Sequence, residues 1–181
     1  MPMILLSGMT IIVPADAALA ALILPTVFSN IQQANAQGFA SALSSIGQFK
    51  MFLIVGALFL LLGAYLTPLI PSQLFLGIMG CLIVSFSLFQ ILGLKFQIDR
   101  GNRLATVFFA SISGFFGGIS GVWGPPTVAY LTALSTEKTE QIRVQGVIYG
   151  LGAALLLFGH LMSGIFSWET APLSAFLVAP A

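Results

Sequence analysis

The chain has 181 residues, of which 58% are hydrophobic and 6% are charged, and its formal net charge is +1. A soluble domain carries about 25% charged residues, so this sequence cannot cover a folded core with a charged surface. The near-neutral charge and the lack of a basic cluster argue against nucleic acid as a partner. The single cysteine, Cys81, excludes a disulfide framework and a Cys/His metal site, and we expect no cofactor. These features indicate an integral membrane protein of several α-helices.

The first 13 residues are apolar, but they do not make a good signal peptide. Such a peptide begins with a positive charge, whereas the first basic residue of this chain is Lys50. The first predicted membrane helix runs from Asp16 to about Gln32 and begins after Pro14. Asp16 suits the positive end of that helix, and a proton-relay role is the alternative. Pro25 lies inside the helix and is expected to kink it.

Further stretches are apolar over about 20 residues, the length that crosses a bilayer as a helix. Three are uninterrupted: 51–67, 73–94 and 144–168. The proline-flanked connection between the first two is short, so we expect an antiparallel hairpin. Lys95, Arg100 and Arg103 gather in and around the connecting loop 96–103, which the positive-inside rule assigns to the cytoplasm together with Lys50. The loop 135–143 carries mixed charge, which leaves its side open.

The segment 104–134 must be broken. As one straight helix its 31 residues would be about 46 Å long, whereas the hydrocarbon core of a bilayer is about 30 Å thick. The break is predicted at 117–126, which reads Gly-Gly-Ile-Ser-Gly-Val-Trp-Gly-Pro-Pro. Irregular backbone at membrane depth is tolerated only where protein covers it or water reaches it. The segment is therefore either a discontinuous span or a re-entrant hairpin. In total we expect an all-α transmembrane bundle of about five to six membrane segments.

The broken segment resembles the signature of the TauE/SafE family, whose members are described as exporters of sulfite and organosulfur anions. That signature spaces glycines before a Gly-Pro-Pro and an apolar stretch with a tyrosine. It is matched here by Gly114, Gly118, Gly121, Gly124, Pro125, Pro126 and Tyr130. Residues 24–33, which begin Leu-Pro-Thr-Val-Phe-Ser-Asn, are similar to a segment of the family's first half. The likeness covers most of the chain.

The resemblance implies an inverted-repeat transporter with a glycine-rich break in each half. Residues 1–95 would then be the remainder of the first repeat, 96–103 the cytoplasmic connecting loop, and 104–181 the second repeat. Only one glycine-rich break is present, and few residues follow the span 144–168. We therefore expect a chain that is truncated at both ends relative to the family, with a C-terminally incomplete second repeat.

The proline pair gives the break its chemistry. A helix that begins there leaves its first N–H groups unpaired and directs its positive dipole end into the break, which suits an oxyanion. Thr127 supplies the first donor after the prolines, with more from residues 121–124. Asn30 and Gln33 share a helix face and are candidates to line a polar pathway. The candidate substrate-binding residues are Gly121, Trp123, Gly124, Pro125, Thr127, Tyr130, Asn30, Gln33 and Gln145.

Each of these residues also has a purely structural interpretation. The glycines fit small-residue helix packing, and the amides fit hydrogen bonds between helices. His160, alone on an apolar helix, suits a hydrogen bond between helices or a proton-coupling role. Trp123 is a candidate for gating or substrate contact.

The function these features predict is export of a small anion, such as sulfite or an organosulfonate, by alternating access. The protein would be a multi-pass protein of the inner cell membrane. Its expected partners are lipid and the anion, and the sequence leaves open whether it forms a homo-oligomer. A non-transporting membrane subunit, or a truncated remnant of a transporter, is the alternative. An enzyme is not expected, because no nucleophile elbow, H-E-x-x-H motif or pair of aspartates is present.

Overall fold

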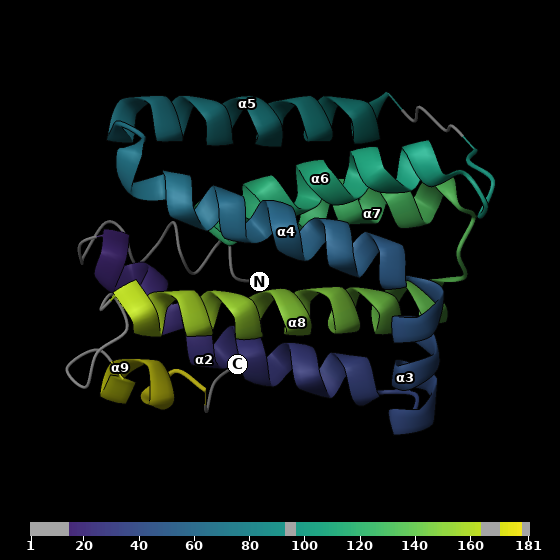
Figure 1. Cartoon of the computed structure of the whole chain (residues 1–181), viewed down its shortest axis with the longest axis horizontal. Helices are drawn as coiled ribbons and strands as arrows, with labels where there is room; N and C mark the ends of the chain where they lie inside the picture. Colours follow the sequence, from purple (N-terminus) through teal and green to yellow (C-terminus); the bar gives the residue numbers. More distant parts are fainter. Residues whose placement is uncertain (1–14, 93–96, 164–170, 179–181) are drawn as a thin grey trace.

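The computed structural model describes residues 15–92, 97–163 and 171–178, and the regular elements in these ranges are helices (Figure 1). This confirms the all-α prediction. In chain order they are α2 (Ala15–Asn35), α3 (Phe39–Gln48), α4 (Lys50–Leu66), the short 3-10 helix η1 (Thr67–Leu69), α5 (Ser72–Ile91), α6 (Arg103–Ser120), α7 (Gly124–Ala133), α8 (Lys138–Ser163) and α9 (Ala171–Phe176). The long helices lie side by side, and α3 crosses them at one end (Figure 1).

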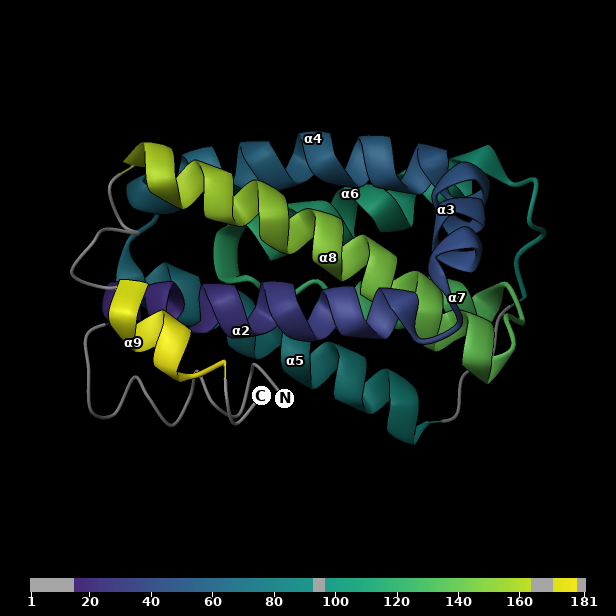
Figure 2. The same ribbon diagram turned by 90° about the horizontal axis from the view of Figure 1, so that it is seen from below.

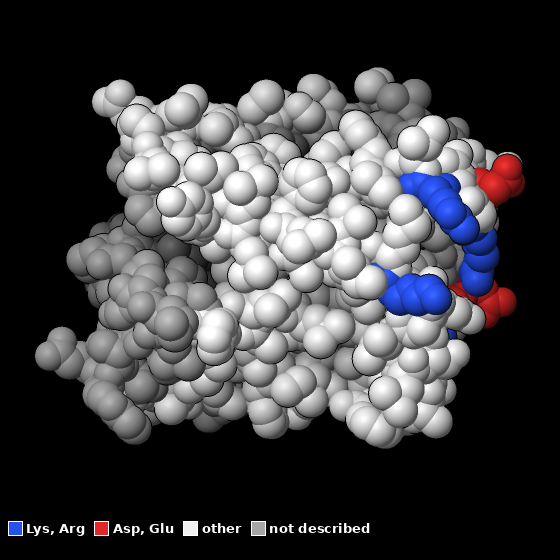
Figure 3. All heavy atoms as spheres, in the orientation of Figure 1, with Lys and Arg blue, Asp and Glu red and all other residues white. Residues whose placement is uncertain are grey.

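The charged side chains of the described residues gather at the end of the molecule where α3 lies (Figure 3). We call this the charged end, and it comprises Lys50, Asp99, Arg100, Arg103, Glu137, Lys138, Glu140 and Arg143. Arg100 Nη2 and Glu140 Oε2 form an ion pair of 3.3 Å, which joins the loop before α6 to the start of α8. The loop 135–143, whose side the sequence left open, therefore lies on the same side as Arg100.

Two described helices, Arg103–Ser120 and Lys138–Phe158, are long and apolar enough to cross a membrane, and α3 with α4 adds a third if this pair is one span bent by 77°. Helices α2 and α5 have 21 and 20 residues and match two other expected spans closely. The total of five to six membrane segments stays a prediction. Helix α2 continues through Pro25 as one helix.

Helix α3 was not predicted, and it is held across the charged end by α8. Arg143 of α8 donates from Nε to Ser45 Oγ at 2.9 Å, and its Nη1 donates to Gln37 Oε1 in the turn before α3. Ser45 is fully buried in this contact, whereas Phe39 and Leu43 of α3 are 69% and 51% exposed. The helix thus turns its small residues Ala42 and Ser45 to the bundle and leaves the large apolar side chains of Phe39 and Leu43 exposed.

The closest helix packing joins α4 and α6, which run parallel. A Cβ atom on Gly114 would overlap the backbone carbonyl of Gly56, and one on Gly118 would overlap that of Leu60. Backbones approach this closely only where small residues meet, which is the usual packing device of membrane helices. Gly114 and Gly118, part of the glycine signature, therefore serve helix packing. On the other side of the bundle, α8 lies between α4 and α2 (Figure 2).

The broken segment is a hairpin of two helices. Helix α6 ends at Gly121, whose φ of 71° is left-handed and suits glycine, and α7 then runs back along α6. The Ile98 N–H donates to the Ala133 carbonyl at 2.8 Å, so α7 ends near the start of α6. Ser113, ten residues beyond Arg103, donates to the Trp123 carbonyl. The beginning of α7 is therefore about 15 Å from the charged end, which is half the thickness of a hydrocarbon core.

The close α4–α6 contact predicts how one added methyl group in it changes the stability of the protein. Gly118→Ala should destabilise the protein by about 1–3 kcal/mol, because the two backbones must separate to admit the Cβ. Gly77→Ala in α5 is the control, since a Cβ there meets nothing within 4 Å. Unfolding midpoints in detergent measure both variants. Equal midpoints for Gly118→Ala and Gly77→Ala would contradict the close packing.

Candidate functional site

The site is built around the indole ring of Trp123, at the break between α6 and α7. A Cβ on Gly117 of α6 would lie 2.6 Å from Trp123 Cε3, and one on Gly152 of α8 would lie 3.4 Å from Cζ3. The ring of Tyr149 lies 6.0 Å from that of Trp123, centroid to centroid. The indole therefore occupies a slot whose walls are the glycines of two helices, and it is 7% exposed.

A cluster of hydroxyl groups holds the break in shape. Ser113 Oγ and Thr127 Oγ1 are 2.6 Å apart, and they lie 3.1 and 2.8 Å from the Trp123 carbonyl oxygen, so their two protons are shared among these three contacts. The Trp123 carbonyl also accepts the Thr127 backbone N–H at 3.4 Å. Ser113 and Thr127 are 2% and 0% exposed. These bonds join the middle of α6 to the first turn of α7, where water would otherwise have to satisfy the backbone.

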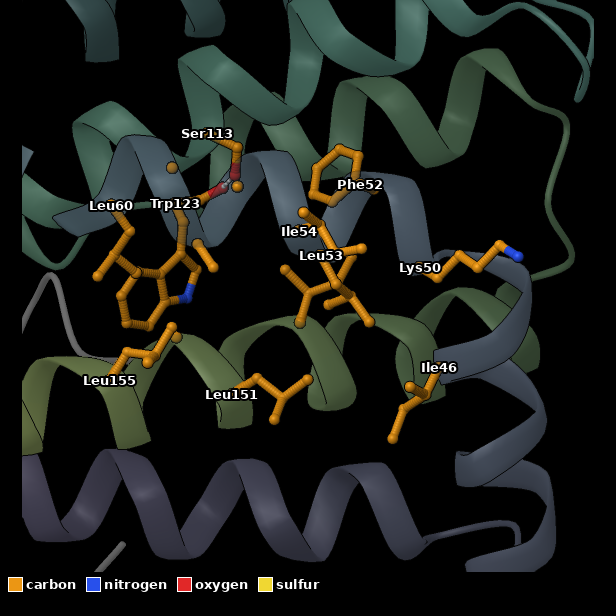
Figure 4. A pocket seen from close by; sticks show the side chains of 15 residues that line it. Ile46, Lys50, Phe52, Leu53, Ile54, Leu60, Ser113, Trp123, Leu151 and Leu155 are labelled. Atoms are coloured by element: carbon orange, nitrogen blue, oxygen red, sulfur yellow. Dashed lines mark hydrogen bonds between the residues drawn. The ribbon is translucent and has the colours of Figure 1, made fainter. Parts of the chain in front are cut away.

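A cavity of about 420 Å³ lies beside this cluster, between α4, α6 and α8 (Figure 4). Ser113 and Trp123 line one end of it and Lys50 lines the other, with apolar side chains such as Leu53 and Ile148 between. Figure 4 shows the indole nitrogen of Trp123 on the side of the ring that faces Leu53. That N–H makes no hydrogen bond to any described residue.

The backbone donors of the break are partly in use. Gly121 N–H donates to the Gly117 carbonyl at 2.8 Å, and Val122 N–H donates to Ser120 Oγ at 3.2 Å. Since Thr127 N–H is also bonded, the free backbone donors among the described residues of the break, 121–127, are the N–H groups of Trp123 and Gly124. Together with the indole N–H they make three uncharged donors near mid-depth.

Comparison with known proteins decides the family. A protein-family model described as Sulfite exporter TauE/SafE matches residues 1–181. The chain belongs to the TauE/SafE family. Its members are membrane transporters and not enzymes, which confirms both the resemblance and the prediction that no catalysis takes place. Neither a curated protein nor a solved structure matches the chain.

The remaining predicted site residues of this TauE/SafE chain do not all meet at Trp123. Asn30 and Gln33 of α2 contact α8. Asn30 is buried beside Gly150, and Gln33 Nε2 donates to the Ile142 carbonyl at 3.0 Å. Gln145 is half-buried on α8. The Gln33 bond therefore agrees with the structural interpretation, in which the amide forms a hydrogen bond between two helices.

Tyr130 lies further along α7, where it lines a separate hollow at the charged end. Pro125 is half-buried and Pro126 buried in the first turn of α7. The side chains of Asp16 and His160 lie outside the described residues.

Sequence reasoning missed Ser113 and Thr106, although a signal existed. They are seven residues apart on α6, so they share a face, and they pair with Thr127 and Tyr130, which are three apart on α7. Matching polar spacings on two apolar segments that are joined by a break predict a hairpin held by hydroxyl groups.

The hydroxyl cluster predicts a measurable loss of stability. Thr127→Val keeps the shape of the side chain and removes one donor to the Trp123 carbonyl, which should cost about 0.6–1.7 kcal/mol. Thr139→Val on the exposed first turn of α8 is the matched control. Unfolding by sodium dodecyl sulfate, followed by circular dichroism, compares the two. A Thr127→Val protein as stable as the control would show that the cluster does not hold the hairpin.

Proposed function

We propose that this TauE/SafE chain exports a small sulfur oxyanion, sulfite or an organosulfonate, by alternating access across the inner cell membrane. The observation that supports the proposal is the set of three unused N–H donors at the break, beside a cavity at mid-depth. Transporters commonly hold substrate near the midplane, where broken helices expose their termini. The positive-inside rule assigns the charged end to the cytoplasm.

The chemistry of the cavity suits an anion that must bind and then leave. The positive end of the α7 dipole and the N–H groups of Trp123 and Gly124 stabilise negative charge without a full counter-charge. Among the described residues that line this cavity, Lys50 alone is basic, and it lies at the end away from Trp123. An anion held by dipoles avoids a deep ion-pair minimum, so its release is not slowed. The apolar side chains, such as Leu53 and Ile148, suit the carbon part of an organosulfonate.

A second function is favoured by one observation. Ile54 and Leu151 line the cavity and are 60% and 43% exposed, so the cavity opens on the surface between α4 and α8. In a membrane, lipid or another chain covers this opening. A subunit that becomes transport-competent only with a partner chain has such a surface, and so does a remnant that no longer transports.

Efflux from proteoliposomes loaded with sulfite or with ethanesulfonate tests the proposal. Trp123→Phe retains an aromatic ring in the glycine slot and removes the indole donor, so the transport rate at low substrate should fall about tenfold, as for one lost hydrogen bond to a charged group. Gly124→Leu should abolish transport by filling the break, whereas Gly77→Leu, on open surface, should not.

The outcomes separate the two functions. Wild-type rates in Trp123→Phe and Gly124→Leu would contradict a substrate site at the break. No efflux from the wild-type chain, with native helix content, would favour the subunit or the remnant.

A further inference from the structure

A second hollow, of about 450 Å³, lies at the charged end, between the start of α4, the start of α6 and the end of α7. We call it the vestibule. Its basic residues are Lys50, Arg100 and Arg103, which are exposed, and none of the described residues that line it is acidic. Its floor is made of buried side chains, among them Phe52 and Tyr130. Figure 3 shows the basic side chains close together at this end.

The vestibule carries an excess of positive charge. Arg100 is paired with Glu140 at 3.3 Å, but Lys50 and Arg103 form no ion pair with any described residue. Clustered charges of one sign around a concave surface raise the local concentration of counter-ions and the rate at which they bind. Two unpaired cations favour an oxyanion, and a dianion more than a monoanion.

The vestibule and the cavity of Trp123 share a wall. Lys50 and Phe52 line both of them. Phe52 is 2% exposed and stacks on Tyr130, with the ring centroids 4.9 Å apart and the planes 24° from parallel. In Figure 4 Phe52 lies between Lys50 and Ser113, which mark the two ends of the cavity. The stacked rings therefore stand where an anion would pass from one hollow to the other.

A hydrogen bond fixes Tyr130 in this position. Its hydroxyl oxygen is 2.8 Å from Thr106 Oγ1, which itself donates to the Asn102 carbonyl at 3.0 Å. Because the Thr106 proton is committed to Asn102, Tyr130 is the donor to Thr106. Tyr130 thus offers no proton to an anion in the vestibule, and its ring is tied to the first turn of α6.

From these observations we infer that the vestibule is a separate entry site for a small oxyanion, and that the Phe52–Tyr130 stack is the gate between it and the Trp123 cavity. The inference rests on the proposed function and adds a capture step and a closed inner gate. An anion held by Lys50 and Arg103 enters the cavity from the vestibule when the Tyr130–Thr106 bond breaks and the rings part. Alternating access requires such a barrier on one side while the other is open.

Transport kinetics test the capture step. Neutralising both cations (Lys50→Gln with Arg103→Gln) should raise the KM for sulfite about threefold to tenfold, leave kcat within twofold, and weaken the dependence of KM on ionic strength. Lys138→Gln, also basic at the charged end but outside the vestibule, should leave KM unchanged. If the double variant has the KM of Lys138→Gln while wild type transports, the vestibule is overturned and the proposed function stands.

Thiol labelling tests the gate without relying on transport. In a Cys81→Ser background, Leu155→Cys provides a probe in the cavity, and a sulfonate-bearing methanethiosulfonate is added from the charged side of oriented vesicles. Phe52→Ala removes half of the stack and Tyr130→Phe only the hydrogen bond, so labelling should accelerate at least tenfold and about threefold, respectively.

Tyr130→Phe keeps the gate testable if Phe52→Ala does not fold, because it retains both rings. Labelling at the parental rate in Tyr130→Phe, and in Phe52→Ala where that variant folds, would overturn the gate. If wild type transports nothing while the gate variants still label faster, the proposed function fails and the gate stands.

Discussion

The shape of the site depends on one carbonyl group. In a bilayer each break in a helix exposes backbone polar groups that water cannot satisfy. Here the Trp123 carbonyl accepts hydrogen bonds from Ser113 and Thr127, which are both buried. This bond set holds α7 against α6 and sets the level at which α7 begins. The position of the Trp123 ring, the free N–H groups and the adjoining cavity all follow from it.

Charge is distributed along the molecule in a way that matches this arrangement. The described ionisable side chains with full charges lie at one end, whereas the cavity beside Trp123 is lined mainly by apolar groups and reached by dipoles. A full charge near mid-depth would be costly to bury, and partial charges on fixed N–H groups avoid that cost. An anion moving inward from Lys50 would therefore leave solvated, fully charged side chains and bind to fixed N–H groups that carry only partial charges.

Much of the fold could be predicted from hydrophobicity, because apolar length is what a bilayer selects. The predicted spans 16–32, 51–67 and 73–94 lie within a few residues of α2, α4 and α5. The break was predicted within 117–126 and lies at 121–123. The third uninterrupted span was predicted six residues late, since α8 begins at Lys138 in a charged segment that hydropathy excludes. Helix α3 was missed, because its 10 residues are too few for a span.

The site was less predictable, because it depends on contacts between segments distant in sequence. The signature predicted that Trp123 and Gly124 matter, but not that Thr127 N–H is already bonded or that Ser113 would share its hydrogen-bond acceptor. The choice between a discontinuous span and a hairpin rested on the backbone angle of Gly121 and on hydroxyl pairs across the turn. Neither can be obtained from hydropathy.

The glycine contact between α4 and α6 limits how the protein can move. Where two backbones touch, no side-chain rotamers lie between them to absorb sliding, so the backbones of α4 and α6, with α7 bonded to α6, should travel as one rigid body, within which the Phe52 and Tyr130 rings part by side-chain rotation. Helix α8 meets this body through larger side chains and through the glycine slot of Trp123. The seam that can shear is therefore the one along α8. During a transport cycle the distance between Trp123 and Gly152 should then change most, while the distance between α4 and α6 stays constant.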